Sequence, residues 1–250
     1  MNEGPQIRVG IGGWVFPPWR GVFYPQGVPQ AQELHFASRA LTTIEINGTF
    51  YGAQKPASYR RWHDESPEDF VFSVKGPRFA THRPDLEGAG PTVDRFLSSG
   101  VLELRDKLGP ILWQFPPSAP ADESALAAFI ELLPNCIDGR TLRHAVELRR
   151  PKIRTDRAID LLSHRGVALV VDDSRPDFET TTNFIYAHLR SCTLEEPTGY
   201  PPEALDGWAQ RLRERSAREA CDCFVYFISG AKVRAPAAAQ ALLRRLTQTS

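Results

Sequence analysis

The chain has few cysteines, no excess of either charge and no long apolar run. Its 250 residues include 4 cysteines, and 30 Lys+Arg balance 30 Asp+Glu. The cysteines show no disulfide framework, and Cys221 and Cys223 lack the two-residue spacer of a zinc or redox pair. We therefore expect reduced thiols and a cytoplasmic protein.

The absence of a long apolar run bears on membranes, and the balanced charge bears on nucleic acid. No run approaches the length that crosses a bilayer, and no leader-like apolar segment precedes Ile7. Zero net charge argues against a broad field for nucleic acid or a membrane surface, although a local basic cleft is compatible with it. We expect no membrane association. Nucleic acid stays a disfavoured alternative partner, and the oligomeric state is left open.

Several common enzyme signatures are also absent. The chain contains no HExxH, GxSxG or Walker sequence, which argues against typical zinc peptidases, esterases and P-loop NTPases. The first glycine-rich turn, GIGGWVFPPW, continues into aromatic and proline residues, whereas a dinucleotide-binding GxGxxG opens a helix. We expect no cofactor.

The chain does contain a regular alternation of short apolar runs and amphipathic stretches. Eight runs read as buried strands: 7–13, 42–47, 70–75, 111–116, 144–149, 168–173, 184–190 and 223–229. Parallel strands covered by helices on both faces explain this pattern. We predict an α/β fold, a single TIM-type (β/α)8 barrel over residues 1–250, with a doubly wound open sheet as the alternative.

The amphipathic stretches between these runs carry helix start and stop signals. Pro56 lies where a helix should begin, Gly109-Pro110 reads as the end of the stretch that begins at Thr92, and Gly166 reads as a residue just past a helix. The connection between the sixth and seventh strands is too short for an ordinary helix. We therefore expect one degenerate unit near strand six.

Polar residues interrupt the apolar character of most strands near their ends. In TIEIN, Glu45 and Asn47 share one strand face, and burying such groups is costly unless partners satisfy them. The C-terminal ends of barrel strands meet at one mouth, where active sites form. We therefore predict that these polar residues converge there: Glu45, Asn47, Lys75, Gln114, Glu147, Arg149, Asp172, Asp173, His188 and Arg190.

Two interpretations of this set stay open. In the first the residues form a site, in which Glu45, Lys75, His82, Glu147 and His188 are the catalytic candidates and the others bind ligand. In the second they form a self-satisfied network without chemistry, in which Glu147 pairs with Arg149 and Lys75 pairs with Glu45.

Three features outside this set are also candidates for ligand binding or catalysis. Trp14 and Tyr51 would form an aromatic lip or would pack the barrel rim, and His82 follows the third strand as a loop acid or base. Lys232 follows the last strand, where barrels often bind phosphate, and the alternative is a solvated cation.

A metal site is conceivable but is not expected. Glu147, Asp172 and His188 have suitable donor atoms for a metal ion. However, Arg149 and Arg190 neutralise the carboxylates without an ion. We therefore expect no metal.

The ordered segments GIGGWVFPPWRGVFYP, EINGTFYGAQKPASYRRW, FVFSVKGPRFATH, KLGPILWQFPP, AVELR and CFVYFISGAKVRAPAAA resemble the YecE-like family (domain of unknown function 72). The resemblance runs from about Ile7 to Leu246 and implies a TIM barrel, but it transfers no reaction. In the family the position of His188 more usually holds arginine. A role that needs a bidentate guanidinium there is therefore in doubt, unless Arg190 replaces it.

These observations favour an enzyme that applies acid/base chemistry to a small anionic substrate, either phosphorylated or carboxylated. A non-catalytic ligand-binding barrel is the first alternative. A nucleic-acid-processing protein, by analogy with endonuclease-IV-like barrels, is the second.

Overall fold

The protein folds around a single parallel sheet in the computed structural model, which describes residues 4–118, 123–149, 155–174 and 180–248. The sheet order is β8-β7-β4-β3-β2-β1-β11-β10-β9. Its strands are β1 (Ile7–Gly12), β2 (Thr43–Ile46), β3 (Val71–Lys75), β4 (Leu108–Phe115), β7 (His144–Leu148), β8 (Ala168–Leu169), β9 (Val171–Asp172), β10 (Phe184–Leu189) and β11 (Asp222–Phe227). A separate small hairpin joins β5 (Cys136–Ile137) to β6 (Arg140–Thr141).

The sheet closes on itself through its two shortest strands. β8 pairs with β7, and β9 pairs with β10, with only Val170 between the two short strands. The Val170 amide donates to the carbonyl of Val146 at 2.9 Å, so β8 and β9 together occupy one strand position of the barrel. The TIM-type (β/α)8 barrel is therefore confirmed, and the open sheet is excluded.

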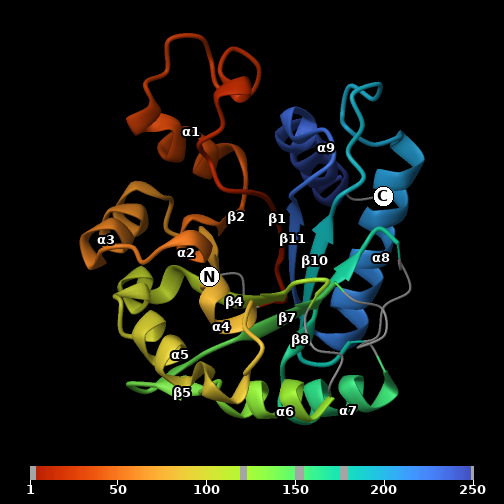
Figure 1. Ribbon diagram of the computed structural model, residues 1–250. Coiled ribbons are helices and arrows are strands. Elements are labelled where there is room, and N and C mark those ends of the chain that lie inside the picture. The colour runs from red at the N-terminus through yellow and green to blue at the C-terminus, as the bar shows by residue number, and fades with distance from the viewer. Residues whose placement is uncertain (1–3, 119–122, 150–154, 175–179, 249–250) are drawn as a thin grey trace.

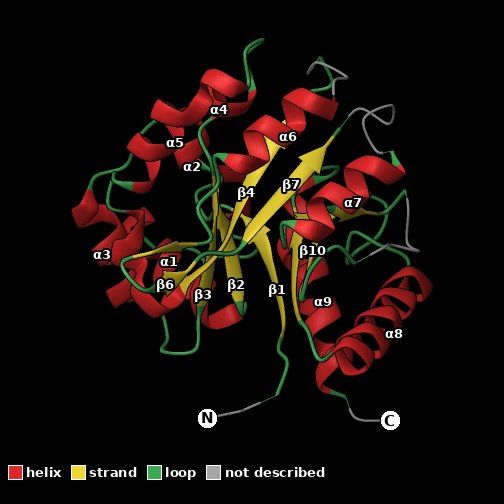
Figure 2. Cartoon of the chain, turned by 90° about the horizontal axis from the view of Figure 1, so that it is seen from below, coloured by secondary structure: helices red, strands yellow, loops and turns green. Residues whose placement is uncertain are grey.

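Helices surround the strands (Figure 2). The α-helices are α1 (Glu33–Ala40), α2 (Gly48–Tyr51), α3 (Pro56–Glu65), α4 (Arg78–Thr81), α5 (Gly90–Leu97), α6 (Glu123–Glu131), α7 (Asp156–His164), α8 (Pro202–Glu219) and α9 (Ala235–Thr247). Short 3₁₀ helices occupy Pro17–Trp19, Gln30–Gln32, Glu87–Ala89, Val101–Lys107 and Lys232–Arg234. Among the described residues, none of these helices combines the length and the apolar character that a bilayer crossing requires.

The strands divide their side chains between two cores, as the period of two requires. Side chains on the outer face, such as Ile44, Val146 and Val225, join the large core that contacts the helices. A smaller cluster fills the barrel interior, where Leu112 and Tyr186 lie. Polar residues at the strand ends therefore point inward, because their apolar neighbours already occupy the outer face.

The helix end predicted at Gly109-Pro110 is wrong. Both residues lie inside β4, which begins at Leu108, and the preceding stretch breaks into α5 and a 3₁₀ segment at Gly100 (φ +102°). A Cβ added to Gly109 would lie 2.6 Å from Cγ1 of Val71 on the neighbouring strand. Close strand packing therefore explains this glycine, which the local pattern made look like a helix stop.

Two other local predictions can be compared with the structure. Pro56 begins α3, and Gly166 follows α7 with φ +64°, as predicted. No helix occurs in the described part of the connection from β9 to β10, namely 173–174 and 180–183, while residues 175–179 lie outside the description.

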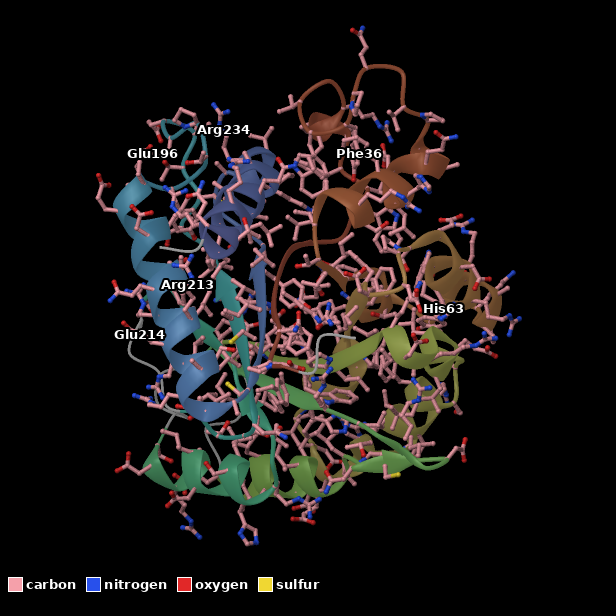
Figure 3. The ribbon with its side chains drawn as sticks, turned by 180° about the vertical axis from the view of Figure 1, so that it is seen from behind. Phe36, His63, Glu196, Arg213, Glu214 and Arg234 are labelled. Atoms are coloured by element: carbon pink, nitrogen blue, oxygen red, sulfur yellow. The ribbon has the colours of Figure 1, made fainter. Side chains whose placement is uncertain are left out.

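The long segment between β1 and α1 and the segment around α9 extend to the same end of the molecule (Figure 1). Phe36 of α1 and Arg234, just before α9, mark them in Figure 3. An aromatic cluster holds the first segment together, with Trp19 fully buried and its ring centroid 5.2 Å from that of Phe16. These segments follow the C-terminal ends of β1 and β11, so they enclose the barrel mouth.

Candidate functional site

Glu45 is a buried carboxylate at the centre of the mouth. Its side chain projects inward from β2 and is 1 % exposed. Oε2 accepts hydrogen bonds from the Tyr186 hydroxyl at 2.6 Å and from Nε2 of His188 at 2.7 Å, both on β10. Burial acts to raise the pKa of Glu45, but the charges of His188 and Lys75 and these two bonds overcome it and lower the pKa to about 2. Glu45 is thus a fixed negative charge.

His188 connects Glu45 to a second carboxylate. Its imidazole is fully buried, and Nδ1 lies 3.4 Å from Oε2 of Glu147 on β7. At the position where the family pattern more usually has arginine, the ring contacts Glu45 by a hydrogen bond and lies close to Glu147 without one. Arg190, two residues further on, forms an ion pair with Glu147.

Glu147 is surrounded by donors, as the self-satisfied network predicts. Gln114 of β4 donates to Oε2, and Nε of Arg149 donates to Oε1 at 3.2 Å. The predicted pairing of Glu147 with Arg149 is thus present. Its carboxylate is 5 % exposed and fully engaged, so we assign Glu147 a part in organising the mouth.

Lys75 does not follow the self-satisfied pattern. Its residue is 9 % exposed at the end of β3, and its ammonium has no hydrogen bond or ion pair with any described residue. Nζ lies 4.6 Å from the ring centroid of Phe50. The predicted pairing of Lys75 with Glu45 is therefore absent among the described residues, and the two groups interact only through their charges.

A cavity of about 500 Å³ opens above these residues at the C-terminal strand ends. Its polar lining includes Glu45, Asn47, Lys75, Arg149 and Lys232. Three of these side chains are cations, whereas Glu45 is the one carboxylate among the described residues of the lining. The cavity is thus locally basic although the whole chain is neutral.

An aromatic wall borders one side of the cavity. Trp14 and Tyr51 both line it, as predicted, and Trp14 packs edge-on against Trp62 with the ring centroids 5.2 Å apart. Tyr51 is 68 % exposed at the entrance. Gly12 keeps the floor open, because a Cβ there would lie 2.8 Å from Nδ2 of Asn47. Trp14 therefore packs against the barrel rim, and Tyr51 forms an aromatic lip at the entrance.

Lys232 reaches the cavity from the end that follows β11. It begins a 3₁₀ turn three residues before α9, and Nζ lies 4.7 Å from the ring centroid of Phe16. Burial lowers the pKa of its ammonium. The predicted position near the cavity is therefore present, although the residue does not open an α-helix.

Six predicted site residues lie outside the cavity lining, namely Glu147, His188 and Arg190, described above, and His82, Gln114 and Asp172. His82 ends α4, and its ring packs edge-on against Phe50 at 5.3 Å, while Gln114 lies beneath the cavity against Glu147. Asp172 does not join the site, because its Oδ1 accepts from the amide of Ser174 at 3.0 Å and holds the turn after β9. The metal set of Glu147, Asp172 and His188 is consequently not assembled in this structure.

Asp173 was predicted with Asp172 to reach the mouth. Its Oδ2 instead accepts from the amide of Ser191 at 2.9 Å and from the hydroxyl of Tyr200 at 2.9 Å, which fixes the backbone beside Arg190. Sequence reasoning missed Tyr186, although the two-residue spacing from His188 puts both on the inner face. That period was the signal that could have found it.

A polar layer lies below Glu45 inside the barrel. The Tyr226 hydroxyl donates to Ser73 at 2.5 Å and lies 2.9 Å from Oγ1 of Thr43. Burial raises the pKa of Tyr186 well above its usual value, and the Glu45 charge adds to this. The tyrosines therefore stay protonated, so that Tyr186 donates permanently to Glu45.

Comparisons with known proteins give a consistent result. A family model described as "Protein of unknown function DUF72" matches residues 8–250. The chain is similar to the UPF0759 protein YecE of Escherichia coli (strain K12), with 28 % identity over 176 residues that cover 68 % of this chain and 60 % of that protein. It thus aligns with less than two thirds of this curated relative's length.

Solved structures of DUF72 family proteins share the fold. One from Thermotoga maritima matches with a TM-score of 0.75 and 23 % identity over 97 % of this chain and 100 % of that one. Another from Enterococcus faecalis has a TM-score of 0.76 and 15 % identity, covering 98 % and 97 % of the two chains. With the family model matching almost the whole sequence, this chain belongs to the DUF72 family, whose function is unknown.

Proposed function

We propose that this protein is an enzyme that binds a small anionic molecule, phosphorylated or carboxylated, in the mouth of the barrel and acts on it by proton transfer. One observation carries the proposal. Among the described residues, three cations line one cavity, and its one lining carboxylate, Glu45, is already bonded to Tyr186 and His188. The field inside the cavity therefore favours an anion.

Two of the cations have no ion pair with a described residue, and the third is only partly engaged. The ammonium groups of Lys75 and Lys232 contact aromatic rings and form no ion pair with a described residue. Arg149 donates one hydrogen bond to Glu147, and its side chain is 38 % exposed. Its other guanidinium donors are therefore available to a phosphate or carboxylate. The aromatic wall of Trp14 and Tyr51 would contact the apolar face of the ligand.

The pKa shifts divide the chemical roles. Glu45, with its pKa near 2, is a weak proton acceptor, and we assign it an electrostatic role. Burial, and then the charges of Arg78, Lys75 and Arg149, lower the pKa of His82, which keeps its imidazole neutral near pH 7. We therefore assign proton transfer to Lys75, which lines the cavity, and to His82, which lies outside the lining against Phe50.

We also propose a cytoplasmic location. All four cysteines lie in the described residues as free thiols, which fits a reducing compartment.

Ligand binding is the first test of this proposal. Sugar phosphates, sugar acids and their neutral parent sugars would be compared by thermal shift and calorimetry. An anion at 100 times its Kd should stabilise the fold by roughly 2.7 kcal/mol, and the neutral parents should not. Arg149→Met should abolish the shift, whereas Lys55→Met, which removes an exposed cation outside the cavity, should retain it.

Turnover then separates the alternatives. Consumption of a bound anion that Lys75→Met abolishes supports the enzyme, and binding without turnover across the panel supports a ligand-binding barrel. Salt-dependent binding of DNA or RNA without any small-anion effect would instead support the nucleic-acid alternative. A flat response to every anion would overturn the proposal.

A further inference from the structure

Lys75 is the more deeply buried of the two described lysines that line the cavity. The residue is 9 % exposed, yet the amine lines the cavity and forms no hydrogen bond or ion pair with a described residue. A buried ammonium without such a partner is costly for stability. Its position therefore indicates a use for the amine that the fold itself does not require.

Lys107 shows how the same fold buries a lysine for structural purposes. It is 5 % exposed, and its Nζ donates to the carbonyls of His63 at 2.6 Å and Ser66 at 2.8 Å, which caps the end of α3. All of its charge is thus satisfied by the protein. Lys75 has the burial of Lys107 without those acceptors.

The surroundings of Lys75 make its ammonium easier to deprotonate than that of an exposed lysine. Burial lowers the pKa of this ammonium below its usual value; the Glu45 charge opposes the effect, and Arg149 and Arg190 reinforce it. Desolvation and neighbouring cations are the two influences that activate lysine as a nucleophile. The same cations would hold an anionic substrate close to the amine.

We infer that Lys75 forms a covalent imine with the carbonyl group of an anionic aldehyde, ketone or 2-oxo acid held in the cavity. This inference deepens the proposed function and depends on it for the recognition of the anion. It rests on the position of the amine at the end of β3, inside a cavity of about 500 Å³ that Arg149 and Lys232 also line. It names a substrate class and gives Lys75 a covalent role.

The reaction can be written with the atoms balanced. The lone pair of neutral Nζ forms a bond to the carbonyl carbon while the carbonyl π electrons move to oxygen. A proton then passes from nitrogen to that oxygen and gives a carbinolamine. Cleavage of its C–O bond with protonation from solvent releases one water and leaves a protonated imine, whose positive charge the nearby Glu45 carboxylate stabilises.

Reductive trapping on the intact wild-type chain tests the inference. The probes are glyceraldehyde 3-phosphate and glyoxylate, with neutral glyceraldehyde as the matched control, each in the presence of sodium cyanoborohydride. Hydride from this reagent adds to the imine carbon and leaves a stable secondary amine on the lysine. Peptide mapping by mass spectrometry then assigns the adduct among five lysines, namely 55, 75, 107, 152 and 232.

We expect the anionic probes to modify Lys75 at low concentration and to saturate it. The neutral probe should give a much smaller yield at the same concentration. Lys75→Arg should lose this adduct while Lys232→Arg, which alters the other cavity lysine, should retain it. Mapping of the wild-type chain keeps the test valid even if Lys75→Arg fails to fold.

Labelling that follows exposure, with Lys55 ahead of Lys75, would overturn the inference. So would an absence of any Lys75 adduct under conditions in which the same anionic probe shifts the melting temperature. In that second result the anion site of the proposed function would stand and only the covalent role of Lys75 would fall. A Lys75 adduct that forms equally well with neutral glyceraldehyde would leave the imine in place and remove the anion site.

Discussion

The two ends of the barrel differ in how their charged groups are paired. At the N-terminal end, Nη1 of Arg143 donates to Asp222 at 2.8 Å and its guanidinium lies 4.7 Å from the ring centroid of Phe224. Arg8 donates to the carbonyl of Asp69 at 2.7 Å. At the C-terminal end, Lys75 and Lys232 have no such acceptors among the described residues.

This difference indicates that the charges at the N-terminal end serve stability and that those at the C-terminal end serve function. At the N-terminal end, Arg143 and Arg8 both have hydrogen-bond acceptors within the protein. At the mouth, Glu45 and Glu147 are surrounded by donors, whereas two of the three cations that line the cavity, Lys75 and Lys232, have no acidic partner among the described residues. Unpaired charge costs free energy, and barrel active sites lie at this end of the strands. The following substitutions test this difference between the two ends of the barrel.

Glu45→Gln should have the largest effect, because it removes the carboxylate that His188 and Tyr186 both contact. Removing one partner of a buried ion pair should lower the free energy of unfolding by about 3 kcal/mol, measured by urea denaturation at pH 7. Glu103→Gln is the control, since its ion pair with Arg60 is exposed and should cost under about 1 kcal/mol. Equal costs for the two variants would contradict the interpretation of the mouth network.

The same carboxylate predicts a pH dependence of stability. The folded pKa of Glu45 is about 2, below its ordinary value of 4.5, so the unfolded chain binds the proton more readily. The stabilisation is therefore complete above pH 4.5 and is lost as the pH falls from 4.5 towards 2, with a total on the order of 3 kcal/mol. In urea melts at pH 6, 5, 4 and 3 the gap between wild type and Glu45→Gln should narrow. A gap that stays constant would show that this pKa shift is absent.

Arg143→Met should have a smaller, destabilising effect at the base. Its ion pair with Asp222 is about one-third exposed on each side, so we expect a loss of about 1 kcal/mol in the free energy of unfolding. Asp222→Asn and the double variant complete a thermodynamic cycle that isolates the pair. Ligand binding at the mouth should stay unchanged, and altered binding would mean that the two ends are not independent.

Lys75→Met should have the smallest effect on stability and the opposite sign. It removes a nearly buried cation without an acidic partner and keeps a side chain of similar length, so the free energy of unfolding should stay level or rise by up to about 1 kcal/mol. Thermal melts and anion titrations of the same sample measure both consequences, and anion binding should weaken. A clear destabilisation would show that the Lys75 charge serves the fold.

Much of this molecule was predictable because strand periodicity is a local property. The inner-face positions of Glu45, Glu147 and His188 were predicted from the two-residue alternation of side chains along a strand. The barrel was predicted from eight apolar runs separated by helical stretches. Where local signals had two physical causes, prediction failed. Gly109-Pro110 has the composition of a helix stop, but Gly109 is required by the close approach of Val71 across the sheet.

The sequence by itself determined which residues face the barrel interior, because side-chain direction along a strand depends only on position in the chain. Tertiary structure decided the partners. Asp172 and Asp173 are adjacent in sequence, yet one holds its own turn and the other anchors the backbone beside Arg190. Likewise, Glu45 on β2 receives its hydrogen bonds from Tyr186 and His188 on β10, and Lys75 on the adjacent β3 has no bonded partner among the described residues. Such pairings depend on closure of the sheet between distant strands, which no local pattern specifies.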